Sequence, residues 1–231
     1  MNETFRIALA GNPNTGKSTL FNTLTGLRQH TGNWSGKTVD MKAGTFSFKE
    51  KQYEIIDLPG TYSLYSNSLD EEIARDYIVF EKPDVTIVIL DATAMERNLN
   101  LALQVLEITE RTIICINLMD EAEKLGIQVN ERILMRRLGV PVIKISARNK
   151  EGIPMLLDTI DRLLRGDLQC TPFHMAYDDE IEQRITSLEP MVKRMFGDIL
   201  PTRWLTLRLL DGDKDLLRKV EKRNAIKEGY K

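Results

Sequence analysis

The sequence predicts an α/β fold in which a mostly parallel sheet has helices on both faces, followed by an all-helical appended domain. Residues 85–91 and 112–116 form continuous apolar runs, which are typical of strands buried on both faces of a sheet. A segment with helical spacing lies between them, and strands that alternate with helices favour a parallel sheet. From Tyr177 onward the pattern is helical only. We therefore predict a first domain at residues 1–167 and a helical domain at residues 168–231.

The composition restricts the class of protein. The chain has 231 residues, of which 42% are hydrophobic, and this is enough for a substantial core. Its formal net charge of −2 provides no basic surface for bulk nucleic-acid binding, so we expect no nucleic-acid partner. The two cysteines, Cys115 and Cys170, lack metal-ligand spacing and fit a reducing compartment. No apolar run reaches about 18 residues and no signal peptide is visible, so we expect a soluble chain.

The elements expected along the chain follow from apolar periodicity. Short runs rich in β-branched and aromatic residues predict strands at residues 5–10, 43–48, 53–57, 85–91, 112–116 and 140–145. Apolar residues at spacings of three and four predict helices at residues 19–24, 71–80, 99–108, 129–138, 153–164, 178–196, 202–210 and 214–227. Pro201 and the turn at residues 211–213 separate the last three helices. Two polar segments without periodicity, residues 27–40 and 58–70, predict long loops of the kind that carry function.

Residues 11–18, GNPNTGKS, match the pattern G-x-x-x-x-G-K-[ST] between a predicted strand and a predicted helix. The two glycines let the backbone turn so that successive N–H groups point toward an anion. We expect Lys17 to reach the β- and γ-phosphates of a nucleotide and the Ser18 hydroxyl to bind Mg²⁺. A glycine-rich turn with a chance match is the alternative. The nucleotide-binding residues expected in and beside this motif are Gly11, Asn12, Asn14, Thr15, Gly16, Lys17, Ser18 and Thr19.

A second motif, Asp57-x-x-Gly60, ends the strand predicted at residues 53–57. A carboxylate at this place can hold Mg²⁺ through water, and the Gly60 N–H can contact a γ-phosphate. The motif is weak by itself. Its position one strand and one loop after the phosphate loop strengthens it, because open α/β sheets bind ligands at the carboxyl ends of their strands.

Two further motifs, Asn117–Asp120 and Ser146–Arg148, follow the strands predicted at residues 112–116 and 140–145. They indicate which base is bound. The Asp120 carboxylate can accept two hydrogen bonds from the N1–H and the exocyclic amine of guanine, which adenine does not offer. Backbone N–H groups of the later motif can meet guanine O6. Each motif alone is also explained by turn and capping chemistry. In this order they predict a guanine-nucleotide site, and its expected base-binding residues are Asn117, Leu118, Asp120, Ser146, Ala147 and Arg148.

The motifs GNPNTGKS, DLPG, NLMD and SAR resemble the G1, G3, G4 and G5 motifs of the translation-factor-related GTPases, which implies a Ras-like P-loop GTPase fold. Four segments make the chain more specifically similar to the N-terminal cytosolic part of the ferrous iron transport protein B (FeoB) family. They are the loop from Gln29, the run DLPGTYSL from Asp57, the acidic helix start at Glu71 and the run RWLTLRLLDGD from Arg203. The resemblance covers essentially the whole chain.

The resemblance implies a slow GTP-hydrolysing regulatory domain that switches between GTP and GDP states to control or drive iron uptake. It implies a downstream transmembrane domain as the partner, a place on the cytoplasmic face of the bacterial inner membrane, and a helical part similar to a GDP-dissociation-inhibitor or spacer domain. Lys17, Thr38 and Gly60 are then the catalytic residues, and Ser18, Thr38 and Asp57 the Mg²⁺ ligands. Asn14 matches a K⁺ ligand of related GTPases, so K⁺ is expected beside GTP or GDP and Mg²⁺. Oligomerisation stays open.

The chain departs from the family pattern at several positions. Thr61 stands where Ras-like proteins have the glutamine that orients the attacking water. Leu118 replaces the lysine of N-K-x-D, so we expect moderate affinity and fast nucleotide release. Two alternative functions remain open: a ribosome- or tRNA-associated GTPase of the same superfamily, and a non-hydrolysing nucleotide-binding module, which the missing glutamine favours. Asn14 is alternatively a turn residue. Trp34, inside the first long loop, is expected either to cover the nucleotide or to contact a partner.

Overall fold

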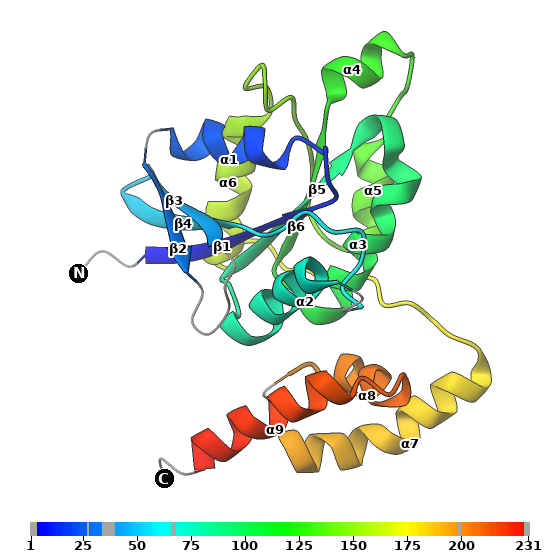
Figure 1. Ribbon diagram of the computed structural model, residues 1–231. Helices are drawn as coiled ribbons and strands as arrows, with labels where there is room; N and C mark the ends of the chain where they lie inside the picture. Colours follow the sequence, from blue (N-terminus) through cyan, green and yellow to red (C-terminus); the bar gives the residue numbers. More distant parts are fainter. Residues whose placement is uncertain (1–3, 27, 34–39, 66–67, 198–199, 229–231) are drawn as a thin grey trace. The chain divides into compact units, whose positions relative to one another are not determined.

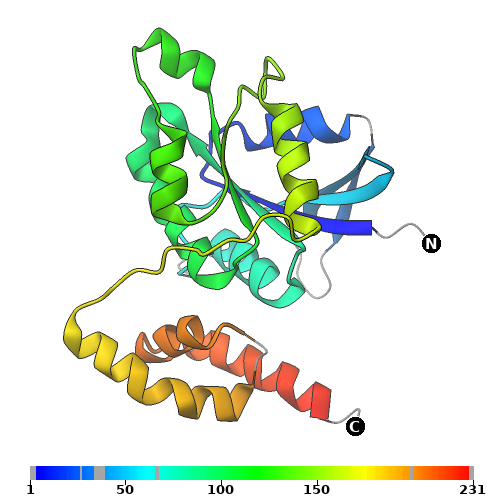
Figure 2. The same cartoon turned by 180° about the vertical axis from the view of Figure 1, so that it is seen from behind.

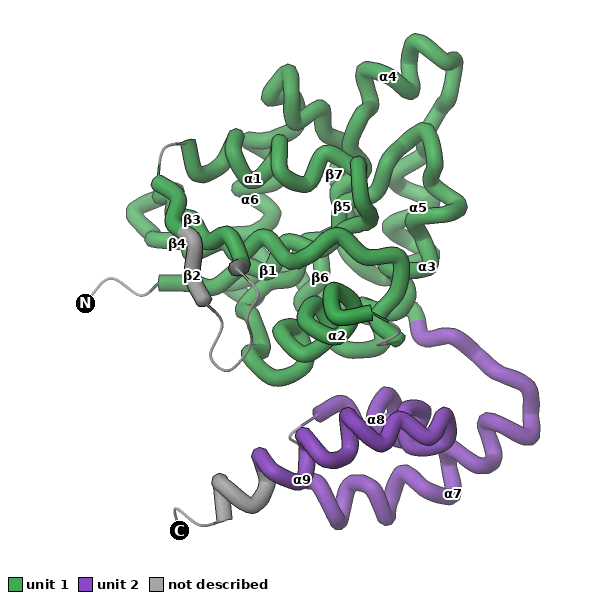
Figure 3. The backbone as a smooth tube through the Cα atoms, in the orientation of Figure 1, with its two compact units in different colours: residues 1–173 green, residues 174–231 purple. Residues whose placement is uncertain are grey.

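The computed structural model describes residues 4–26, 28–33, 40–65, 68–197 and 200–228. They form two compact units, residues 1–173 and residues 174–231, which are coloured separately in Figure 3. The domain boundary expected after residue 167 stays a prediction.

Unit 1 is built on a sheet whose described strands run in the order β2-β3-β4-β1-β5-β6-β7 (Figure 1). Strands β4, β1, β5, β6 and β7 pair in parallel, whereas β3 pairs antiparallel with both β2 and β4. The strand bounds are β1 Thr4–Gly11, β2 Gln29–Asn33, β3 Asp40–Phe48, β4 Lys51–Asp57, β5 Val85–Asp91, β6 Thr112–Asn117 and β7 Val142–Lys144. The predicted α/β fold with a mostly parallel sheet is confirmed.

Helices cover both faces of this sheet: α1 and α6 lie on one face, and α2, α3 and α5 lie on the other (Figures 1 and 2). Their bounds, with the shorter α4, the π-helical turn η1 and the 3₁₀ turn η2, are α1 Lys17–Thr25, α2 Leu69–Asp76, η1 Tyr77–Glu81, η2 Ala92–Ala94, α3 Met95–Ile108, α4 Met119–Lys124, α5 Glu131–Leu138 and α6 Ile153–Leu164.

The continuous apolar runs serve both faces of the sheet, as predicted. In β5, Ile87 and Ile89 belong to the core that α1 and α6 share, and Val88 and Leu90 alternate with them. All four side chains are fully buried. Because both faces of the central strands are covered in this way, the site-bearing loops emerge only at the strand ends.

Three elements differ from the sequence expectations. Residues 29–33 were expected in a loop but form β2, which pairs with β3 from Gln29 opposite Gly44 to Asn33 opposite Asp40. This edge strand is short, and its residues QHTGN include no large apolar side chain, so no apolar alternation marks it in the sequence. The helix expected at residues 71–80 changes to a π-helical turn at Tyr77. The short helix α4 was not expected, and it begins at Met119, inside the Asn117–Asp120 motif.

In the described part of unit 2, all regular elements are helices: α7 Asp179–Phe196, α8 Thr202–Leu210 and α9 Lys214–Glu228. Their apolar faces bury Phe196, Trp204 and Leu216 among other side chains. Arg203 of α8 binds Glu182 of α7 with two hydrogen bonds of 2.9 and 2.7 Å. The predicted all-helical appended domain is confirmed. Within the described residues, no helix of the chain is long and apolar enough to cross a membrane.

Candidate functional site

The loop between β1 and α1 has the left-handed backbone that its sequence demands. Asn14 has φ of 66° and Gly16 has φ of 81°. A side chain at Gly16 is excluded on steric grounds as well, since a Cβ there would lie 2.2 Å from Nδ2 of Asn117. The Thr15 hydroxyl closes the turn by donating to the Asn12 carbonyl at 2.9 Å. The loop ends where α1 begins, at Lys17, so the positive end of that helix faces the turn.

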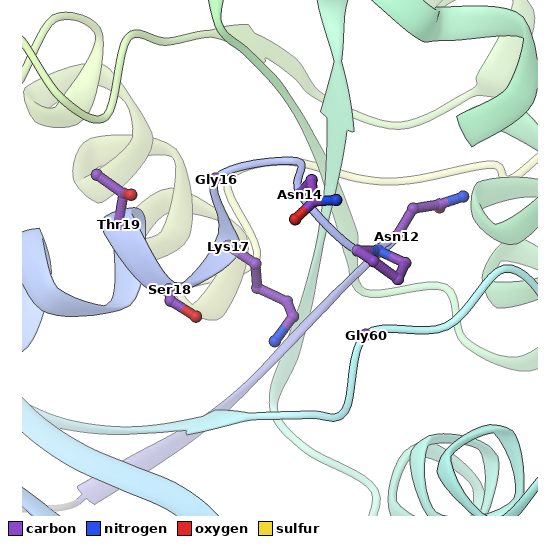
Figure 4. Close-up of a pocket in the computed structure, with 8 residues that line it drawn as sticks. Asn12, Asn14, Gly16, Lys17, Ser18, Thr19 and Gly60 are labelled. Carbon is purple, nitrogen blue, oxygen red and sulfur yellow. The ribbon is translucent and has the colours of Figure 1, made fainter.

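A pocket of about 430 Å³ lies at this loop. Lys17 and Ser18 project to the same side of the loop, whereas the Asn12 side chain points away from them (Figure 4). The lining residues are Asn12, Pro13, Asn14, Gly16, Lys17, Ser18, Thr19 and Gly60. Two motifs that are separated in sequence, the phosphate loop and Asp57-x-x-Gly60, therefore share one pocket.

Lys17 joins the two motifs by direct contacts. Its ammonium group forms an ion pair with the Asp57 carboxylate and donates to the Leu58 carbonyl at 2.6 Å. The side chains of Lys17 and Asp57 are only 11% and 7% exposed, so each charge depends on the other. A carboxylate and the nearby Ser18 hydroxyl are hard oxygen donors of the kind that Mg²⁺ takes. The residues present therefore fit a magnesium ion. Thr38 and Trp34, which the sequence analysis added, lie outside the described residues.

Asn117 connects the phosphate loop to the loop that follows β7. Its Nδ2 donates to the Thr15 carbonyl at 2.9 Å, and its Oδ1 accepts from the Ala147 N–H at 2.9 Å. The side chain is 1% exposed, so both ends of the amide are satisfied inside the protein. This bridge was not predicted, because the sequence motif suggested contact with a base and not contact between two loops.

The remaining base-site residues gather beside this bridge. The Ser146 hydroxyl donates to Oδ1 of Asp120 at 2.9 Å. Leu118 has φ of 62°, a conformation that is rare for leucine and that accumulates at functional sites. Arg148 is exposed. One contact that the sequence analysis missed is the Thr23 hydroxyl of α1, which donates to the Ala147 carbonyl at 3.1 Å.

The start of the loop after β4 is tied to the underside of the phosphate loop. The Thr61 N–H donates to the Gly11 carbonyl at 3.2 Å. Gly60 lies beside Pro13, since a Cβ on Gly60 would be in van der Waals contact with the Pro13 Cα at 3.4 Å. All four motifs thus lie at one edge of the sheet, the edge formed by the carboxyl ends of β1, β4, β6 and β7. Such an arrangement can hold a phosphorylated ligand whose ring lies toward Asp120.

Two family models match this chain. A family model described as ferrous iron transport protein B matches residues 5–160, and a model described as the FeoB cytosolic helical domain matches residues 177–231. The Fe(2+) transporter FeoB of Escherichia coli (strain K12) is 42% identical over 213 residues, which cover 90% of this chain and 27% of that transporter. The chain therefore spans only about a quarter of the length of the curated relatives it matches.

Solved structures give the same result for the fold. The cytosolic domain of T. maritima FeoB in a GDP form has a TM-score of 0.87 at 35% identity, covering 96% of this chain and 86% of that chain. The GMPPNP form of the same domain has a TM-score of 0.83 at 36% identity, covering 94% of this chain and 85% of that chain.

Proposed function

Because the chain belongs to the family of ferrous iron transport protein B, we propose that it binds GTP and GDP and hydrolyses GTP slowly, as the regulatory part of a ferrous iron transporter. The observation that carries this proposal is the Asn117 bridge. It joins the phosphate loop at Thr15 to the loop at Ala147, so a phosphate site and a base site are held at a constant separation. A nucleotide of one size fits such a pair of sites.

The phosphates bind to the loop between β1 and α1 in this proposal. Backbone N–H groups of the turn and the N-terminus of α1 supply the anion site. Lys17 leaves Asp57 and turns to the β- and γ-phosphates. The residues of the loop that contact the nucleotide are Gly11, Asn12, Asn14, Thr15, Gly16, Lys17, Ser18 and Thr19.

Ser18, Thr38 and Asp57 would hold Mg²⁺ in this proposal. The ion neutralises charge on the phosphate oxygens when it is bound. With the ion in place, Asp57 would keep a cation beside it when Lys17 turns to the phosphates. The buried carboxylate needs a positive partner in either state, and this requirement links the position of Lys17 to the metal.

The guanine base lies against the second half of the site. Asp120, oriented by the hydroxyl of Ser146, accepts from the two N–H groups on the guanine edge. Leu118 covers one face of the base with an aliphatic side chain, and backbone N–H groups at Ala147 and Arg148 meet O6. Asn117 supports both halves from below.

Hydrolysis proceeds without the glutamine of Ras-like enzymes, because Thr61 occupies that position. Lys17, Thr38 and Gly60 are the catalytic residues, with Gly60 donating its N–H to the γ-phosphate. The Asn14 side chain would hold K⁺, which would supply further positive charge to the phosphates. The Asn14 side chain is exposed and lines the pocket, as this role requires.

The potassium proposal has a direct test. Phosphate release from GTP is expected to be faster in potassium chloride than in sodium chloride at equal ionic strength. The variant N14A is expected to lose the difference and keep the rate measured in sodium. Equal rates in the two salts for the unmutated chain would leave Asn14 as a turn residue.

The function as a whole is tested by nucleotide competition and phosphate release. GTP and GDP are expected to displace a fluorescent GDP derivative, and ATP is not. Equal competition by ATP would overturn the guanine assignment. Binding without phosphate release would instead support a non-hydrolysing module, and co-sedimentation with ribosomes would support a ribosome-associated GTPase.

Coupling to transport requires a membrane partner. We place the chain on the cytoplasmic face of the bacterial inner membrane, joined to a transmembrane domain of the same polypeptide. The loop at residues 58–65 leads along the chain toward α2, so a change at Gly60 has a path into the rest of unit 1.

A further inference from the structure

One face of α3 holds the loop segment that directly follows Gly60 and Thr61. The guanidinium carbon of Arg97 lies 4.5 Å from the centre of the Tyr62 ring, which is a cation–π contact. Nδ2 of Asn100 donates to the Tyr62 carbonyl at 3.4 Å. The Leu64 N–H donates to Oε1 of Gln104 at 2.6 Å.

Arg97, Asn100 and Gln104 lie on one face of α3, because they are spaced three and four positions apart on the helix. Nε2 of Gln104 donates to Oδ1 of Asn100 at 3.4 Å, which orients the Gln104 amide with its oxygen toward Leu64. The opposite side of α3 is buried against the sheet through residues such as Leu101 and Val105. The loop is therefore held by a rigid support, and Leu64 itself is only 4% exposed.

The same loop is also held at its root, by contacts with Lys17 and with Gly11. Lys17 is bound to Asp57 and the Leu58 carbonyl, and the Thr61 N–H is bound to the Gly11 carbonyl. Lys17 gives up its hydrogen bond to the Leu58 carbonyl when it turns to phosphates, so residues 58–61 lose one of the contacts that fix them and can shift toward a γ-phosphate. The contacts at residues 62–64 oppose that shift.

We propose that Arg97, Asn100 and Gln104 form a latch, the α3 latch, whose residues position the loop after Gly60 and hold it back until a γ-phosphate binds. The inference rests on the proposed GTP and GDP switching. The latch is closed in the empty and GDP-bound states and opens in the triphosphate state. Because a ligand shifts an equilibrium only through its different affinities for the two states, the latch lowers affinity for GTP and leaves affinity for GDP unchanged.

The test compares the affinities of the whole chain for GDP and for a non-hydrolysable GTP analogue. Q104L removes the acceptor for the Leu64 N–H, so affinity for the GTP analogue is expected to rise about 3- to 10-fold, the worth of one hydrogen bond. Affinity for GDP is expected to stay within about 2-fold, which also verifies folding of the variant. Q104E keeps an acceptor oxygen and is expected to restore the unmutated ratio. E96L, an apolar substitution at an exposed α3 position, is the matched control.

A second pair of variants tests the stacking contact independently. Y62L and R97A are each expected to raise the ratio of GTP-analogue to GDP affinity, and the double variant is expected to equal either single variant, because both remove the same contact. An unchanged ratio in Q104L, or weaker binding of the GTP analogue with GDP binding intact, would overturn the latch. Failure of the unmutated chain to bind either nucleotide would overturn the proposed function, and the latch with it.

Discussion

Asp120 is the residue on which base choice depends at the level of a single side chain. We expect D120N to weaken GTP and GDP binding, because each lost charge-assisted hydrogen bond costs about 1.5–3 kcal/mol. The amide can donate where the carboxylate only accepted, so xanthosine nucleotides, which carry a carbonyl in place of the amine, are expected to bind the variant better than guanosine nucleotides. Calorimetric titration with the di- and triphosphates of both nucleosides measures both effects.

The control for this substitution is E121Q, which makes the same chemical change at the neighbouring exposed position. It is expected to keep the guanine preference. If D120N bound GDP as tightly as the unmutated chain, the base would not contact Asp120.

Gly16 carries the close approach between the phosphate loop and Asn117. G16A is expected to destabilise the chain by more than the approximately 1–2 kcal/mol that a left-handed alanine costs, because its Cβ would lie 2.2 Å from Nδ2 of Asn117. G166A isolates the backbone cost, since Gly166 has φ of 78° and a Cβ on it would meet no other atom within 4 Å. Urea unfolding of the two variants gives the difference, and equal losses would contradict the steric role of Asn117.

At the scale of elements, the Arg203–Glu182 pair joins α7 to α8. The two hydrogen bonds from Arg203, with a backbone hydrogen bond from Tyr177, lower the pKa of Glu182 to about 2. The unfolded value is about 4.3. A lowered folded pKa means that the stabilisation is complete above about pH 4.3 and is lost as the pH falls toward about 2. We expect R203A to unfold the helical unit at higher pH than the unmutated chain.

Trp204 reports this transition, because it is 5% exposed in α8. The chain has two tryptophans, so the substitution W34F leaves Trp204 as the single probe in an acid titration. R184A is the control, since the Arg184–Glu180 pair lies on α7, the helix of Glu182, and both of its side chains are more than half exposed. Exposed pairs of this kind contribute little. Coinciding titration curves for R203A and R184A would contradict the prediction.

At the scale of the whole molecule, the family resemblance inferred from sequence is confirmed by the two family models, which together match both units. Asp120 therefore also provides a test of whether nucleotide binding controls transport. In a polypeptide that joins this chain to the proposed transmembrane domain, we expect iron uptake into proteoliposomes to depend on GTP and not on xanthosine triphosphate. D120N is expected to reverse this dependence, because the base site in this chain then selects the nucleotide that transport uses.

The reversal is its own control for folding and membrane insertion, since the same variant must be active with one nucleotide and inactive with the other. D120N could instead keep its binding of xanthosine nucleotides and take up iron at a rate that neither nucleotide changes. That result would contradict the prediction, because nucleotide binding would then not control transport.

Local patterns were sufficient to predict the fold class and the four motifs. Continuous apolar runs identify strands buried on both faces, as in β5 and β6, because such burial leaves few polar positions inside the run. The phosphate loop is readable for a similar reason: Gly16 must adopt a left-handed conformation, and that demand is local to the chain. The edge strand β2 was missed, because its residues QHTGN show no apolar alternation and its pairing with β3 is made by the backbone.

Only the tertiary structure decided which motif residues contact one another. Asn117 meets Thr15 and Ala147 because strand order brings β6 between β5 and β7 and strand register sets where each loop begins. The pairing of Lys17 with Asp57 and the contact of Gln104 with Leu64 join residues about 40 positions apart. Sequence by itself determined the chemical groups at the sheet edge, whereas their partners follow from long-range packing, which no local pattern encodes.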